Sequence, residues 1–198
     1  MSQPEHSSDD HDYLRRLPAG AYQGRAFVHW SMTIEGRKKG WLKPIVYYKL
    51  REVLTHAAFR YSFCCPIYCL MPDHMHFMWV GFEDKSDQLL GARFFRKHMG
   101  PVLQYVGVEF QTQAHDRVLR EDERQQEAFE DVVDYIARNP ERANLVRAGE
   151  FQKYEYTGCL IPGYPTLKIW QAGFWSLFWR IHSRLSGRDL EGSDGEVE

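Results

Sequence analysis

The sequence lacks a run of about 18 apolar residues, the length that a helix needs to cross a membrane. Residues 1–5 are polar and acidic, which is unlike a signal peptide. These absences exclude a transmembrane helix and a secretory leader of the usual kind. We therefore expect a cytoplasmic protein that makes no membrane contact.

Cysteine is scarce. The four thiols are Cys64, Cys65, Cys69 and Cys159, and they form neither a C-x-x-C pair nor a disulfide framework. Buried, reduced cysteines are the simpler interpretation. A zinc site built from Cys65, Cys69 and His74 is an alternative, although this spacing matches no standard zinc motif.

An overall basic charge is also missing, since the net charge is −2. The acidic residues, however, gather at the two ends: four lie in residues 1–12 and five in residues 189–198, with no Lys or Arg in either segment. Of the 27 acidic residues, these nine lie in the ends, which leaves 18 against 25 basic residues and a body of +7. Such acidic ends are typical of disordered segments. A basic body between them permits binding to a phosphate backbone.

Hydrophobic periodicity predicts interleaved strands and helices. We expect strands at residues 26–33, 65–71, 74–80 and 110–118, with the second and third forming an antiparallel hairpin. We expect helices over residues 44–61, 87–99 and 121–139, where apolar residues recur every three to four positions. The pairs Gly100-Pro101 and Asn139-Pro140 are expected to end the second and third helices.

This order predicts an α+β fold in which an antiparallel sheet has helices packed on one face. From about Gly158 an extension follows, where Trp170, Phe174, Phe178 and Ile181 fit one helical stripe. Such a stripe is more typical of a helix docked on the body than of a base-stacking or membrane surface. We therefore place the main domain at 13–157 and the extension at 158–187, between acidic ends at 1–12 and 188–198.

Two histidines stand out in the third predicted strand. Residues two apart in a strand point to the same face, so His74 and His76 lie side by side while Met75 points to the opposite layer. Simple alternation does not assign Phe77 and Trp79 clearly to a buried or an exposed face. Two adjacent imidazoles suit one divalent metal with open positions for water or phosphate oxygens. Half-buried, hydrogen-bonded histidines explain the motif equally well.

The third predicted helix carries a tyrosine on its flank. Its core stripe comprises Phe129, Val132, Val133 and Ile136. Tyr135 and Asn139 are four residues apart and share a face about 100° away from that stripe. A phenol there can reach a site, and the amide oxygen of Asn139 can ligate a hard metal. Helix geometry alone favours an ordinary boundary tyrosine and a helix-ending asparagine.

Two segments resemble a known family. Residues 70–77, Leu-Met-Pro-Asp-His-Met-His-Phe, resemble the MPxHxH segment of the HUH single-tyrosine transposases. Residues 135–146 resemble that family's YI-x-x-NP-x-RA-x-LV helix end. The likeness is strongest to the REP-associated tyrosine transposases and runs from about Arg15 to Val146. The two motifs in one chain, in this order, are a specific signature.

The resemblance implies a ferredoxin-like or RRM-like HUH core with a defined chemistry. His74 and His76 would be metal ligands, and Asn139 would be the third, where family members carry Gln or Asn. The metal would be Mg²⁺ or Mn²⁺ and would polarise the scissile phosphate. Attack by Tyr135 would leave a 5′-phosphotyrosine and a free 3′-hydroxyl. Because a phenol ordinarily ionises only near pH 10, this attack would require a nearby cation.

The expected partner is single-stranded or hairpin DNA. The basic residues that we expect to hold its backbone are Arg15, Arg16, Lys38, Arg93 and Lys97. Taken alone, each of them is more simply a solvated surface charge. Some members of the family complete the active site with a helix from a partner chain and others are monomer-like, so a monomer or a homodimer is expected.

Three functions are thus compared. The leading one is metal-dependent nicking and strand transfer by a transposase-type endonuclease. The second is a catalytically silent, sequence-specific DNA-binding protein of the same fold; the presence of His74, His76, Tyr135 and Asn139 together argues against it. The third, a histidine-based nucleotide hydrolase, needs an H-x-H-x-H strand, but position 78 is Met78.

Overall fold

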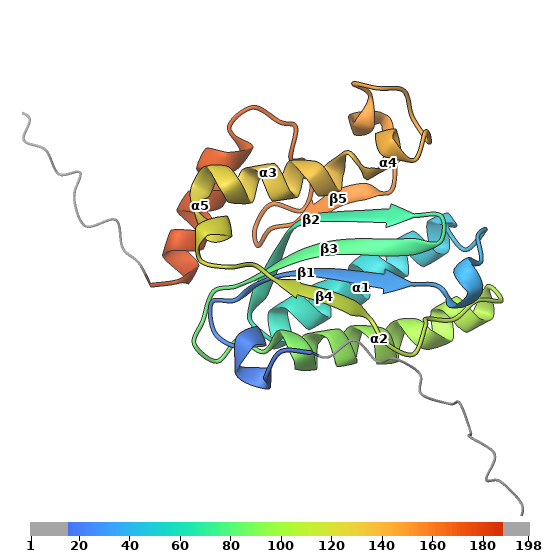
Figure 1. The fold of residues 1–198 in the computed structure, drawn as a ribbon, viewed down its shortest axis with the longest axis horizontal. Coiled ribbons are helices and arrows are strands. Elements are labelled where there is room, and N and C mark those ends of the chain that lie inside the picture. Colours follow the sequence, from blue (N-terminus) through green and yellow to red (C-terminus); the bar gives the residue numbers. More distant parts are fainter. Residues whose placement is uncertain (1–15, 188–198) are drawn as a thin grey trace, which may run out of the picture.

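The computed structural model describes residues 16–187. Its centre is a five-stranded antiparallel sheet in the order β4-β1-β3-β2-β5 (Figure 1). The strands are β1 (Phe27–Thr33), β2 (Phe63–Met71), β3 (His74–Gly81), β4 (His115–Val118) and β5 (Thr157–Leu160). The predicted α+β class, the antiparallel sheet and the β2–β3 hairpin are confirmed.

Five α-helices accompany the sheet within the described residues. They are α1 (Pro44–Arg60), α2 (Gln88–Tyr105), α3 (Gln126–Ala137), the short α4 (Asn139–Arg142) and α5 (Phe174–Leu185). Four 3-10 turns are also present in these residues, at Ala19–Tyr22, Glu35–Arg37, Asp122–Arg124 and Phe151–Lys153. Pro44 begins α1 as predicted, because a proline in the first turn lacks only an N–H that the helix does not use. None of the helices in residues 16–187 is long and apolar enough to cross a membrane.

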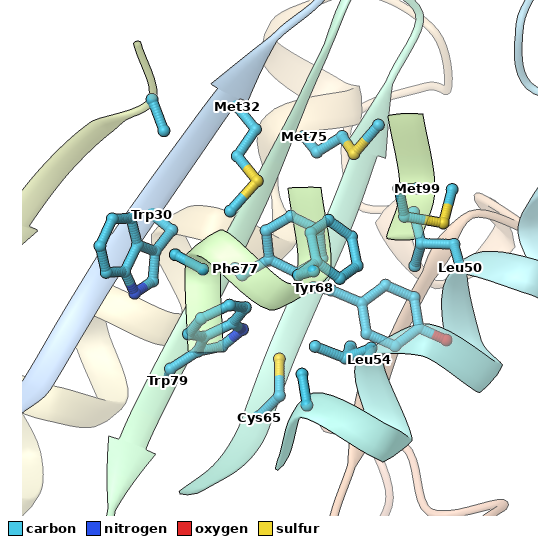
Figure 2. Packing of buried hydrophobic residues seen from close by; sticks show 14 of the residues in the cluster. Trp30, Met32, Leu50, Leu54, Cys65, Tyr68, Met75, Phe77, Trp79 and Met99 are labelled. Carbon is cyan, nitrogen blue, oxygen red and sulfur yellow. The ribbon is translucent and has the colours of Figure 1, made fainter. Parts of the chain in front are cut away.

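The helices cover both faces of the sheet, so the prediction that they pack on one face is wrong. Helices α1 and α2 lie on one face, and α3 and α5 lie on the other (Figure 1). The residues of β3 explain why: Phe77 and Trp79 are buried on the α1/α2 side (Figure 2), and Met78 and Val80 are buried on the α3/α5 side. A strand that is apolar on both sides must be packed against helices on both faces of the sheet. Simple alternation of polar and apolar residues therefore could not assign Phe77 and Trp79 to a face.

Helix α2 continues past the Gly-Pro pair at 100–101, where the sequence predicted its end. Pro101 is exposed and removes one N–H from the helix ladder. Met99 and Leu103, four residues apart, are both fully buried on the core side of the helix. Burial of Leu103 offsets the interruption, because a fully buried leucine contributes about 1.5–3 kcal/mol.

Strand β4 is shorter than predicted and β5 was not predicted. The segment expected as a strand from Phe110 becomes regular only at His115, and Phe110 itself forms an isolated bridge with Ile34. Strand β5 pairs with β2 at the sheet edge, so the sheet continues through the boundary placed between residues 157 and 158. Gly158 allows this pairing, since a Cβ there would collide with the ring of Tyr68.

The aromatic extension docks on the body, as predicted. Phe174 and Phe178 of α5 are each 1% exposed, and the Phe178 ring stacks 5.8 Å from Phe129 of α3. Ile181 packs at the margin of the same cluster, whereas Trp170 precedes the helix. The extension thus completes the core on the α3 side of the sheet.

Candidate functional site

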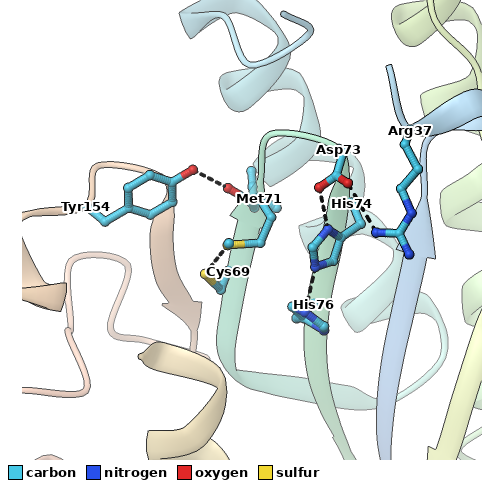
Figure 3. Close-up of polar contacts among 8 residues, drawn as sticks. Arg37, Cys69, Met71, Asp73, His74, His76 and Tyr154 are labelled. Atoms are coloured by element: carbon cyan, nitrogen blue, oxygen red, sulfur yellow. Dashed lines mark hydrogen bonds and ion pairs between the residues drawn. The ribbon is translucent and has the colours of Figure 1, made fainter. Parts of the chain in front are cut away.

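The two histidines of β3 lie on the face that α3 covers. Strand alternation places His74 and His76 on the same side as Met78, and both imidazoles are half-buried. Their Nε2 atoms are 2.9 Å apart, with the ring planes at 88° (Figure 3). The structure therefore brings the predicted pair together edge to face, with one nitrogen of each ring directed at the other.

The opposite nitrogen of each ring has its own partner. Nδ1 of His74 lies 2.7 Å from Oδ1 of Asp73, whose Oδ2 is 3.1 Å from the guanidinium of Arg37 (Figure 3). Nδ1 of His76 lies 3.0 Å from Nε2 of His29 on β1. Because an ionised carboxylate only accepts hydrogen bonds, Nδ1 of His74 is the donor to Asp73, and Nε2 of His74 is the nitrogen that faces His76.

Burial keeps the central imidazole neutral. It lowers the pKa of His76 to about 3, with added repulsion from His29, His74 and Arg142. Burial also lowers the pKa of His29 to about 4, with a smaller contribution from Arg117. A neutral imidazole retains the lone pair that metal coordination needs, so His76 is in a ligating form at neutral pH.

The donor set of the two histidines fits a single metal ion. Two donors about 2.1 Å from an ion at right angles lie about 3 Å apart, against 2.9 Å for the two Nε2 atoms. Residues 16–187 contain no group of three or more His, Cys, Asp or Glu side chains that could hold a metal. A metal here would therefore take its other ligands from an amide, water or a bound phosphate.

The alternative zinc site is wrong. Cys65 packs in the cluster on the α1/α2 face, whereas Cys69 and the two histidines of β3 lie on the other face. All four cysteines are buried and unpaired. Burial raises the pKa of the Cys69 thiol to about 12, so that thiol is protonated at neutral pH. The interpretation of the cysteines as buried and reduced is confirmed.

Tyr135 occupies the flank of α3, as its spacing predicts. Phe129, Val133 and Ile136 on the same helix are fully buried, while Tyr135 is 59% exposed. The guanidinium carbon of Arg142 lies 3.7 Å from the centre of the Tyr135 ring. The phenol is thus accessible, with a cation directly against its face.

Asn139 is placed differently from the prediction. Helix α3 ends at Ala137, Arg138 departs from helical geometry, and Asn139 begins α4, so the continuous Tyr135–Asn139 helix face is broken. The Nδ2 atom of Asn139 donates to the Ile136 carbonyl at 3.1 Å. Its Oδ1 accepts a hydrogen bond from Arg142 at 2.8 Å. The amide oxygen is therefore engaged by a cation rather than directed at an imidazole.

Helix α4 nevertheless lies close to the histidines. It sits at the end of the sheet where β2 ends (Figure 1), and Pro140 is buried. The charge of Arg142 lowers the pKa of His76 and also acts on Cys69, the cross-strand partner of His76. Arg142 therefore stands within electrostatic range of the phenol of Tyr135 and of the imidazole pair.

The residues predicted to hold DNA do not form one surface. Lys38 is exposed directly after Arg37, which contacts Asp73, and it lines a hollow together with Gln104 and Gly107 at the end of α2. Arg93 and Lys97 are exposed on α2, which covers the opposite face of the sheet.

Of the two remaining members of that set, Arg16 lies beside Arg93. Arg16 pairs with Asp116 of β4 at 2.9 Å. It also lines a hollow of about 380 Å³ together with Arg93 and Arg96. Arg15 lies outside the described residues.

Sequence reasoning missed three residues of the site. Asp73 sits inside the histidine motif, and its adjacency to His74 was the available signal. His29 carried no signal, because only the pairing of β1 with β3 brings it to His76. Arg142 belongs to the segment that resembles the transposase helix end, yet its contact with Tyr135 depends on the break at Arg138.

No protein-family profile and no curated protein matches this sequence. The structure is similar to a solved structure of a REP-associated tyrosine transposase bound to a REP hairpin, with a TM-score of 0.59. The two chains are 19% identical, and the match covers 73% of this chain and 80% of the other. At this identity the similarity establishes the fold. The chain therefore has the fold of a REP-associated tyrosine transposase, as its two motifs predict.

Proposed function

We propose that this chain is a metal-dependent DNA strand-transfer enzyme of the HUH single-tyrosine type, acting on single-stranded hairpin DNA. The observation that carries the proposal is the imidazole pair: two Nε2 atoms 2.9 Å apart, each on a ring whose Nδ1 already has a partner. The exposed phenol of Tyr135 and the guanidinium of Arg142 against its ring would complete the chemistry.

The proposed ligands are His74 and His76, with Asn139 as a third donor, and the ion is Mg²⁺ or Mn²⁺. When bound, the ion supplies charge that polarises the scissile phosphate. Asp73 holds the proton on Nδ1 of His74 and so keeps its Nε2 available. His29 orients His76 in the same way, because Nε2 of His29 can accept a hydrogen bond from the Nδ1–H of that ring and leave Nε2 of His76 for the metal.

Tyr135 is the proposed nucleophile. Its phenol oxygen forms a bond to phosphorus as the bond from phosphorus to the 3′ oxygen breaks. The phenol proton leaves to solvent, and the departing 3′ oxygen takes up a proton to become a 3′-hydroxyl. The 5′-phosphotyrosine link conserves the phosphodiester, so a second 3′-hydroxyl can attack it, release Tyr135 and join two strands without a nucleotide cofactor.

The choice of a hairpin substrate rests on the similar structure, in which a transposase is bound to a REP hairpin. On this chain, Lys38 is the exposed cation of the predicted set that directly follows Arg37, whose side chain contacts Asp73 beside His74. A backbone phosphate held there would lie close to the metal ligands. The second proposal, a protein that binds such DNA without cutting it, predicts the same binding but no covalent product.

An adduct assay separates these two functions. Hairpin DNA labelled at its 3′ end is incubated with the protein and Mn²⁺, because the fragment downstream of the cut would stay on the tyrosine. Denaturing electrophoresis should show labelled protein that disappears with chelator and in Tyr135→Phe. The matched control is Tyr105→Phe, since Tyr105 is 86% exposed at the end of α2. DNA binding by the wild-type chain without any adduct would favour the binding-only function.

A further inference from the structure

Arg142 is a cation without a carboxylate partner among residues 16–187. Its guanidinium lies 3.7 Å from the centre of the Tyr135 ring, and it donates to the Tyr135 carbonyl and to Oδ1 of Asn139. Arg138, on the same short segment, shows the contrast: it pairs with Asp134 at 2.7 Å and with Glu141 at 3.3 Å. The charge of Arg138 is therefore neutralised by carboxylates, whereas the charge of Arg142 is available to bind an anion.

The guanidinium of Arg142 has the chemistry that phosphate binding requires. A guanidinium binds phosphate oxygens through two parallel N–H donors and is weakly hydrated, so it exchanges one anionic or carbonyl partner for another readily. The side chain is exposed, and its charge reaches His76. A phosphate placed between Tyr135 and the imidazoles would therefore lie within its range.

The oxygen that Arg142 now holds is the one proposed to ligate the metal. The hydrogen bond from Arg142 to Oδ1 of Asn139 is 2.8 Å long. A guanidinium and a divalent ion on the same amide oxygen would repel each other, so they compete for it. While Arg142 rests on Asn139, the metal site has two imidazoles and lacks its third side-chain donor.

We propose that Arg142 is a further catalytic residue, which binds the scissile phosphate and masks Asn139 until DNA arrives. The inference rests on the proposed function, because it assumes that a phosphodiester meets Tyr135 beside the metal ligands. When DNA binds, the guanidinium leaves Oδ1 of Asn139 for the non-bridging phosphate oxygens. Asn139 is then free to complete the metal site, so substrate binding and metal binding strengthen each other.

This mechanism predicts that Arg142→Ala raises the affinity for Mn²⁺ but lowers the rate of adduct formation. Without DNA, Arg142→Ala should bind Mn²⁺ about fivefold more tightly than the wild type, because about 1 kcal/mol of hydrogen bonding no longer competes for Asn139. With DNA, the same variant should form the tyrosine adduct about 100-fold more slowly, the usual loss when one donor to a transferring group is removed. A residue with a merely structural role would not tighten metal binding.

The test is a calorimetric titration of the full-length chain with Mn²⁺, followed by the adduct assay on the same preparations. Arg147→Ala is the matched control and should change neither the Mn²⁺ affinity nor the adduct rate by more than about twofold, because Arg147 is an exposed arginine and surface changes of this kind have small effects. Arg142→Lys keeps the charge without the planar fork and should recover part of the adduct rate. In Arg142→Ala combined with Asn139→Ala, the gain in Mn²⁺ affinity should vanish.

An Mn²⁺ affinity in Arg142→Ala that equals or falls below the wild-type value overturns the inference, and Arg142→Gln repeats the measurement if the alanine variant loses its far-ultraviolet circular dichroism. A gain in affinity that persists without Asn139 also overturns it. Failure of the proposed function looks different, since an adduct would then be absent from the wild type or would survive in Tyr135→Phe. The Mn²⁺ titrations remain decisive for the masking of Asn139 in that case.

Discussion

In this site, the residue that contacts Nδ1 of each histidine orients the ring and its Nε2 atom. Nδ1 of His76 faces His29, and Nδ1 of His74 faces Asp73, so both rings are oriented with Nε2 toward a common point. Partners behind a metal ligand fix its ring orientation and tautomer, and removing them typically weakens metal binding by about 10- to 100-fold. The candidate site therefore extends beyond the two histidines of the motif.

His29→Leu should weaken Mn²⁺ binding by about tenfold while the chain stays folded, because Nδ1 of His76 loses its partner. The dissociation constant from calorimetry measures this directly. His56→Gln is the matched control, since His56 is exposed on α1, on the other face of the sheet. Equal Mn²⁺ affinity in His29→Leu and in the wild type would show that His29 has no part in the site.

The sequence predicts individual residues of the site better than their contacts. His74 and His76 follow from strand alternation, and the exposure of Tyr135 follows from helix spacing. The contact of His29 with His76 depends on which strands become neighbours, and local periodicity contains no such information. The orientation of Asn139 depends on one non-helical residue, Arg138, whose effect no 3.6-residue pattern predicts.

At the level of elements, the body is completed by the aromatic helix α5. Phe178 stacks on Phe129 of α3, and both rings are almost fully buried. Since α3 also carries Tyr135, the packing of α5 fixes the helix on which the proposed nucleophile lies. The extension is thus part of the structure that supports the site.

Phe178→Ala should lower the free energy of unfolding by about 3–5 kcal/mol, the usual cost of truncating a buried phenylalanine. Urea denaturation followed by tryptophan fluorescence measures this. Phe59→Ala is the matched control: Phe59 is 90% exposed on α1, so its loss should cost less than about 0.5 kcal/mol. A similar small effect for both variants would mean that α5 does not stabilise the body.

The sheet shows why element boundaries and layers were harder to predict than element types. Hydrophobic alternation identified β1, β2 and β3, but a strand buried on both faces has no polar side, so the second helix layer was not foreseen. Strand β5 is four residues long and contains Gly158, a residue that by itself predicts a turn. Only its fit against Tyr68 makes that glycine part of a strand.

On the scale of the whole molecule, the basic residues face different sides. Lys38 directly follows Arg37, which contacts Asp73 beside His74, and it lines a hollow at the C-terminal end of α2, while Lys97 lies in the middle of α2. A DNA strand that enters the proposed site should therefore contact Lys38 and should leave Lys97 in solvent. The position of each lysine, rather than the net charge of the protein, should therefore determine its effect on the affinity for hairpin DNA.

Lys38→Glu and Lys97→Glu change the net charge equally, so they compare position at constant charge. We expect Lys38→Glu to weaken hairpin binding by about tenfold and to reduce the salt dependence, because a phosphate contact is lost. Lys97→Glu should change the affinity by about twofold at most, through long-range electrostatics alone. Fluorescence anisotropy at several salt concentrations measures both quantities. An equal loss in the two variants would place the DNA elsewhere on the molecule.

The central claim is that Tyr135 becomes covalently linked to DNA, and mass spectrometry of the digested adduct tests it most directly. After the reaction with hairpin DNA and Mn²⁺, the protein is treated with nuclease and protease. The peptide that contains Tyr135 should then carry the added mass of a 5′-phosphorylated nucleotide, with fragmentation placing it on the phenol. The same mass on a peptide that lacks Tyr135 would contradict the account.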